Sequence, residues 1–318
     1  MGQYNRNRWV SLARISTEIT NINLESKRRD FVNQKRYSDL FPSAFFRYTI
    51  NDHHKFQLSL SRRINRPRNW MIIPFSSFTD ERNVFSGNPE IDPSYTNLSE
   101  LNYNYKISKK LSINPTLYYR GTSDEMEFFV EKQTVTIDNE TREVFVSTIA
   151  NIGQYNAFGL EMGVSYKPFP WWNMYLEFTF NGFKQVGSFR GASFDGEGVL
   201  IYGRYNTTIS FLDYFKLQVQ NNYRGPIETG QYKRKGIYQM NAGLSIDLFN
   251  QRGLLTFNIN DVFNSGVRKV TSFGSDFTRD LELQNRIRQI NLSFSYIFNQ
   301  NKNKGKKGNQ YDNFKIIN

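Results

Sequence analysis

The sequence predicts an all-β fold, an antiparallel transmembrane β-barrel of about twelve strands, from three observations. Only 38% of the 318 residues are hydrophobic and no run of 20 apolar residues occurs, yet 16% are aromatic. Apolar and polar residues alternate along most of the chain, which places each set on its own face of a sheet. Short and long connections alternate as well, as they do between the two rims of a membrane barrel.

Composition excludes several kinds of site. The chain has no Cys, so it can form no disulfide, thiol nucleophile or Cys-ligated metal centre. Its two His, His53 and His54, leave little room for a metal site or a Ser-His-Asp triad. The 41 Lys and Arg outnumber the 29 Asp and Glu, but the excess is spread out, which disfavours a nucleic-acid-binding stripe. We therefore assign no catalytic residue, no metal, no cofactor and no nucleic-acid partner, and we expect no enzyme.

Strands are expected where apolar residues recur at every second position. In residues 172–180 (WNMYLEFTF), every even position is apolar and most odd positions are polar. Several such segments reach or exceed the roughly 9–11 residues with which a strand crosses a bilayer. The predicted strands are 8–24, 41–51, 54–64, 94–106, 110–132, 142–166, 171–185, 199–212, 214–226, 234–249, 252–266 and 283–299.

The connections between these strands alternate in length and thereby orient the chain. Long connections are expected at 25–40, 65–93, 133–141, 186–198, 227–233 and 267–282. Tight turns are expected at 51–54, 106–109, 167–170, 212–214 and 250–251. Bacterial outer-membrane barrels have short periplasmic turns and long extracellular loops. The last strand then ends at the periplasm, and residues 300–318 form a basic, disordered periplasmic tail.

Aromatic residues gather near the ends of the predicted strands, where a membrane belt would lie. The alternative is a soluble sheet with ordinary core aromatics. The opposite face of these strands is rich in Asn, Ser, Gln, Glu and Lys, which suits water and not a second packed sheet. The aromatics concerned are Tyr103, Tyr105, Tyr118, Tyr119, Trp171, Trp172, Tyr214, Phe215, Tyr296 and Phe298.

Four segments resemble those of a known family when they are taken in order. They are 61–67 (SRRINRP) with 73–75 (IPF), 87–93 (GNPEIDP), 258–264 (NINDVFN) and 295–298 (SYIF). In this order they resemble the C-terminal half of the barrel of a TonB-dependent outer-membrane receptor, of the outer-membrane β-barrel protein family. Ile73 stands where that family usually has Asn, and Ser94 where it usually has Glu. The resemblance covers about residues 1–299.

This resemblance implies a 22-stranded barrel with an N-terminal plug domain and a short TonB-contacting segment. We therefore expect residues 1–299 to be the C-terminal portion of such a barrel in the cell outer membrane, in a fragment that lacks plug, N-terminal strands and export signal. The implied function is active uptake of a nutrient such as a siderophore, haem, glycan or peptide. One alternative is a self-contained twelve-stranded passive channel or structural barrel, and another is a soluble carbohydrate-binding β protein.

Candidate site residues follow from the loops and from the last strand. In the longest loop, Trp70, Phe75 and Phe78 are candidate ligand contacts, and packing against the barrel rim is their alternative role. Gly87, Asn88, Pro89 and Pro93 form the signature loop, which is either a stiffener or related to ligand binding. Gly87 is expected to supply a positive φ, and both prolines should precede the next strand.

The remaining candidates concern partners and charges. Tyr296 and Phe298 resemble the aromatic-ended signal for barrel assembly, so the expected partners are outer-membrane lipid and the barrel-assembly machinery. The TonB system is a partner only if the missing plug is present, and the small-molecule or oligomeric substrate is unknown. Three acidic pairs are expected to be solvated loop charges, with hydrolysis or calcium binding as the alternative: Asp80/Glu81, Asp124/Glu125 and Asp195/Glu197.

Overall fold

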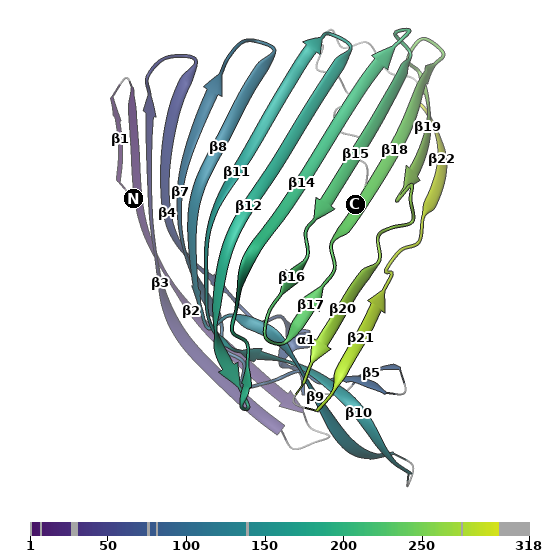
Figure 1. Cartoon of the computed structure of the whole chain (residues 1–318). Coiled ribbons are helices and arrows are strands. Elements are labelled where there is room, and N and C mark those ends of the chain that lie inside the picture. The colour runs from purple at the N-terminus through teal and green to yellow at the C-terminus, as the bar shows by residue number, and fades with distance from the viewer. Residues whose placement is uncertain are drawn as a thin grey trace.

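The computed structural model describes residues 2–6, 8–26, 31–74, 77–80, 82–137, 140–274 and 276–298. Thirteen strands follow one another in chain order in a single antiparallel sheet, and the short β13 (Ala192–Ser193) pairs with one of them (Figure 1). The thirteen are β1 (Gly2–Arg6), β2 (Trp9–Ser26), β3 (Phe31–Thr49), β4 (His54–Asn65), β7 (Ser94–Lys106), β8 (Leu111–Ser123), β11 (Gly153–Phe169), β12 (Trp172–Phe189), β14 (Gly196–Phe211), β15 (Phe215–Arg224), β18 (Ile237–Leu248), β19 (Gly253–Asn260) and β22 (Gln289–Tyr296).

Strand register separates an apolar face from a polar face. Residues directly opposite each other in an antiparallel pair share a face. One continuous row across seven strands is apolar: Phe46, Leu58, Leu101, Leu117, Leu160, Phe180 and Ile201. The adjacent row on the other face is mainly polar: Arg47, Gln57, Asn102, Thr116, Glu161, Thr179, Tyr202 and Arg224. An exposed apolar row suits lipid and a polar row suits water, so the first marks the outer wall and the second the inner wall.

Tight turns lie on one rim of the sheet and long connections on the other, as the alternation of loop lengths predicts (Figure 1). The long connection expected at 25–40 was wrong, because β2 and β3 pair as far as Ser26 and Phe31. Aromatic rings meet along the tight-turn rim: Trp9 stacks on Tyr48 with centroids 3.9 Å apart, and Phe169 stacks on Trp171 at 5.1 Å. Such rings favour the headgroup region of a bilayer. No helix in the described part of the chain is long and apolar enough to cross a membrane.

The long connections carry secondary structure of their own beyond the other rim (Figure 1). One small sheet has the order β5 (Ser77–Asp80), β6 (Asn83–Phe85), β10 (Glu140–Asn151) and β9 (Met126–Ile137), with α1 (Asn69–Ile72) beside it. A second has the order β16 (Ile227–Glu228), β17 (Tyr232–Arg234), β20 (Arg268–Phe273) and β21 (Thr278–Leu283). A buried cluster of Ile72, Ile91 and Ile149 joins α1 to β10.

Several predicted boundaries were wrong. The strands expected at 110–132 and 142–166 each divide in two, because the chain leaves the main sheet after β8 and returns at β11. Asp124, with φ of 55°, turns the chain at the first of these points. The third strand begins at residue 31 and not at 41, and β1 adds a strand that was not expected. β7 begins directly after Pro93, as expected for a residue that cannot donate to the ladder.

The sheet does not close into a barrel. β1 and β22 lie at the two ends of the strand order, and neither pairs with the other. The fold is thus an open antiparallel wall with inner and outer faces, which confirms the predicted β fold. The basic tail expected at 300–318 lies outside the described residues.

Candidate functional site

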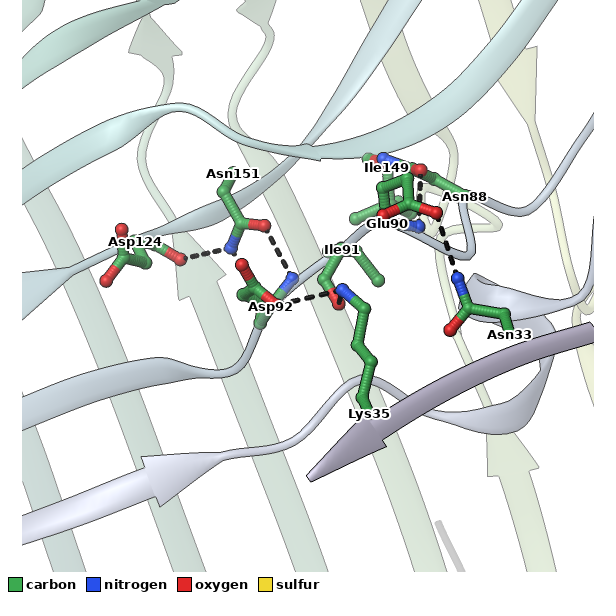
Figure 2. A network of polar contacts seen from close by, with 9 residues as sticks. All are labelled: Asn33, Lys35, Asn88, Glu90, Ile91, Asp92, Asp124, Ile149 and Asn151. Atoms are coloured by element: carbon green, nitrogen blue, oxygen red, sulfur yellow. Dashed lines mark hydrogen bonds and ion pairs between the residues drawn. The ribbon is translucent and has the colours of Figure 1, made fainter. Parts of the chain in front are cut away.

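The signature loop 87–93 is fastened at its start by Asn88 (Figure 2). The Asn88 side-chain nitrogen donates to the Ile149 carbonyl in β10 at 3.0 Å, and its side-chain oxygen accepts the Glu90 N–H at 3.0 Å. The Asn88 backbone N–H donates to the Met71 carbonyl in α1 at 2.6 Å. Asn88 therefore shapes the loop and ties β10 to α1.

The end of the same loop is held by Lys35 of β3 and Asn151 of β10 (Figure 2). Lys35 donates to the Ile91 carbonyl at 3.0 Å and pairs with the Asp92 carboxylate at 2.8 Å. Asn151 accepts the Asp92 N–H at 2.8 Å and donates to the carbonyls of Asp92 and Asp124, each at 2.9 Å. These contacts bind the loop to the barrel wall and to the turn before β9.

The signature loop also contributes a side chain to a buried apolar core, which favours a structural role for the loop over a role in ligand binding. Ile91 is 1% exposed and packs with Ile72 and Ile149. The expected positive φ at Gly87 was wrong, because only Gly153 and Gly191 among the glycines adopt it within the described residues. A Cβ on Gly87 would lie 2.3 Å from the Ile73 carbonyl oxygen, so glycine is required there for close backbone approach.

The three candidate ligand contacts do not form one site within the described part of the chain. Trp70, in α1, is 42% exposed, and its ring lies 5.3 Å from Phe85 and 6.2 Å from Phe128. Phe75 lies outside the described residues. Phe78 lies in β5, opposite Val84, but its side chain lies outside the described part. Trp70 thus packs against Phe85 of β6 and Phe128 of β9 and remains partly exposed.

The 258–264 segment forms a turn built around one carboxylate. Asp261 has φ of 54°, which ends β19 before the predicted boundary at 266. Its carboxylate accepts the Ser265 N–H at 2.9 Å and the Gly266 N–H at 2.8 Å, and its carbonyl accepts the Asn264 N–H at 2.9 Å. The motif therefore directs the chain out of the sheet at the loop rim.

The last strand ends in an aromatic cluster at the tight-turn rim. Tyr296 closes β22, and its ring lies 4.7 Å from Phe298 and 5.8 Å from Phe249. The exposed fraction of Phe298 is 80%, so its ring is available to lipid or to another protein.

A hollow of about 430 Å³ on the inner wall was not found from the sequence. Arg204 of β14, Arg224 of β15 and Arg268 of β20 line it, together with the single carboxylate of Glu177. The guanidinium of Arg204 lies 3.8 Å from that carboxylate. The residues come from separate strands, so no local motif marks them.

Glu125 and Glu127, at the start of β9, are less exposed to water than the solvated loop charges that the sequence predicts. Asp124 is exposed as expected, but burial raises the pKa of Glu125. Burial, followed by the Glu125 carboxylate, raises the pKa of Glu127 to about 7. Within the described residues, no group of three or more His, Asp or Glu side chains is placed to hold a metal ion.

A comparison with models of protein families identifies the family of this chain. Residues 15–296 match the model of a family described as outer membrane protein beta-barrel family. This chain belongs to that family. Its location is accordingly the outer membrane, and its fold is that of an outer-membrane β-barrel. No curated protein matches the sequence.

Solved structures share the fold at low sequence identity. The FrpB iron transporter from Neisseria meningitidis is 13% identical with a TM-score of 0.58, over 92% of this chain and 44% of that one. The siderophore receptor PiuA from Acinetobacter baumannii is 13% identical at 0.58, over 91% and 41%. The copper transporter OprC is 12% identical at 0.55, over 93% and 47%. The chain thus spans less than half the length of these proteins.

Proposed function

We propose that this chain forms the C-terminal part of the barrel of a TonB-dependent receptor that imports a nutrient across the outer membrane. The observation that carries the proposal is the open thirteen-strand sheet, whose edges at β1 and β22 have no partner strand among the described residues. An unpaired backbone group in lipid costs several kcal/mol. In a 22-stranded barrel of the kind that the sequence resembles, further strands would pair with both edges.

The substrate class is a scarce, small or oligomeric nutrient such as a siderophore, haem, glycan or peptide. The structures that share the fold are described as an iron transporter, a siderophore receptor and a copper transporter, which supports import. The mainly polar inner row supports a wet interior. In this proposal Trp70 contacts ligand at the loop rim, and the assembly machinery recognises Tyr296 and Phe298. The TonB system acts through a plug.

The test is the size of the native polypeptide in outer-membrane fractions, measured on an immunoblot with antibodies raised against this chain. A band far above 37.5 kDa, together with nutrient uptake that stops when TonB is removed, supports the proposal. A heat-modifiable band at 37.5 kDa that forms a conducting pore in planar bilayers contradicts it. That second result would favour a self-contained passive barrel.

A further inference from the structure

The inner-wall hollow carries more positive charge than its own residues compensate. Arg204 and Arg224 lie in successive inward-facing rows, since Arg204 is opposite Asn222 and Arg224 is opposite Tyr202. Arg268 enters the same hollow from β20. Glu177 is the one carboxylate in the described lining, so two of the three positive charges lack a counter-charge.

The arginines are also poor in protein partners. Arg224 and Arg268 form no ion pair with any described residue, and the Arg224 guanidinium instead lies 5.5 Å from the centre of the Tyr202 ring. Arg234, on neighbouring β17, has two guanidinium nitrogens, Nε and Nη2, that are buried without a hydrogen-bond partner. Burial, followed by the positive charge of Arg224, lowers the pKa of Arg234.

The side chains of Arg204, Arg224 and Arg268 are exposed to the hollow, and three positive charges beside a single carboxylate give it a positive potential that attracts anions. A guanidinium presents a planar fork of N–H donors that matches the two oxygens of a carboxylate or phosphate. The hollow also offers the side-chain amides of Asn222 and Gln239 as further donors. Its volume of about 430 Å³ lies within the usual range for small-molecule pockets.

We propose that this hollow binds a carboxylate- or phosphate-bearing solute between Arg204, Arg224 and Arg268. The site rests on the arginines alone, whereas the statement that the solute is transported cargo rests on the proposed function. The same chemistry could come from an acidic segment of the polypeptide inside the barrel, and the experiment separates these two sources.

The experiment titrates citrate and, separately, inorganic phosphate into the purified full chain in detergent at low salt, by calorimetry. We expect saturable binding of at least one probe, weakened about tenfold to a hundredfold by either Arg204→Gln or Arg224→Gln. The control is Arg47→Gln, an inner-wall arginine on β3 that pairs with Gln57 and lies six strands from β14. It should bind as the unchanged chain does. Far-ultraviolet circular dichroism checks that each variant keeps the β-structure of the unchanged chain.

Two results would overturn the proposal. The first is equal binding by the unchanged chain and by the Arg204→Gln/Arg224→Gln double variant. The second is no saturable binding of either probe by the unchanged chain, which would leave the arginines to a carboxylate of the polypeptide inside the barrel. Neither result depends on TonB, so failure of this site and failure of the transport proposal are distinguishable.

Discussion

Replacing Glu127 by glutamine should stabilise the β9–β10 hairpin at and above neutral pH. Burial, reinforced by the Glu125 carboxylate, raises the pKa of Glu127 from its ordinary value of 4.5 to about 7. The folded hairpin therefore holds a proton that the open hairpin releases. The stability linked to this proton is fully present below about pH 4.5 and is lost as pH rises through about 7.

The size of this effect follows from the two pKa values. The difference between 4.5 and about 7, at about 1.36 kcal/mol for each pH unit, corresponds to roughly 3 kcal/mol lost by about pH 8. Opposing influences, the Phe128 backbone and the Arg234 charge, are already contained in that pKa. Glutamine keeps the size of the side chain and cannot ionise. The variant should thus gain roughly 3 kcal/mol at pH 8 and almost nothing at pH 4.5.

Hydrogen exchange measured by mass spectrometry can follow the opening of amides paired between β9 and β10. Variant and unchanged chain are compared at each pH, so that the intrinsic pH dependence of exchange cancels. The control is Glu143→Gln on the same hairpin, because the Glu143 carboxylate is exposed and pairs with Lys132 at 2.7 Å. If Glu127→Gln tracks the unchanged chain to within about 0.5 kcal/mol at pH 8, the desolvation argument is wrong.

Three further substitutions test the loop core, the turn after β19 and the buried arginine. Ile91→Ala should cost about 2–5 kcal/mol and hasten proteolysis of the loop sheet, because Ile91 is 1% exposed; unchanged cleavage would refute this. Asp261→Ala leaves two backbone N–H groups without their acceptor and should cost about 1–3 kcal/mol, seen as a lower melting temperature by circular dichroism. Arg234→Met removes buried unpartnered nitrogens and should leave that temperature equal or higher without added anion; a marked fall would contradict the reasoning.

The main sheet could be predicted because its two faces meet different solvents. Along β12 the apolar residues Met174, Leu176, Phe178 and Phe180 lie on the outer wall, so the period of two appears directly in the sequence. The same signal misled the prediction at 110–132, because apolar residues also recur at every second position in β9, at Met126, Phe128 and Val130. Periodicity reports that a strand has a buried side, but not which sheet it joins. The sharp turn at Asp124 is what separates β8 from β9.

The motifs that carried the family resemblance have mainly architectural roles in the structure. Asn88 and Asp261 each satisfy backbone groups where the chain changes direction, so their chemistry is visible in a short segment. Such residues fix where the wall ends and where the loops begin. They carry no information about what the wall binds.

The positions of the inner-wall arginines, in contrast, cannot be predicted from any short segment of the sequence. Arg204 and Arg224 meet only because β14 and β15 pair in one register, and Arg268 joins them only because β20 folds back over the same rim. A shift of that register by one residue would turn Arg224 toward the outer wall and remove it from the lining of the hollow. The charge that could select a solute is therefore a property of strand pairing, and it can be recognised only once the sheet is assembled.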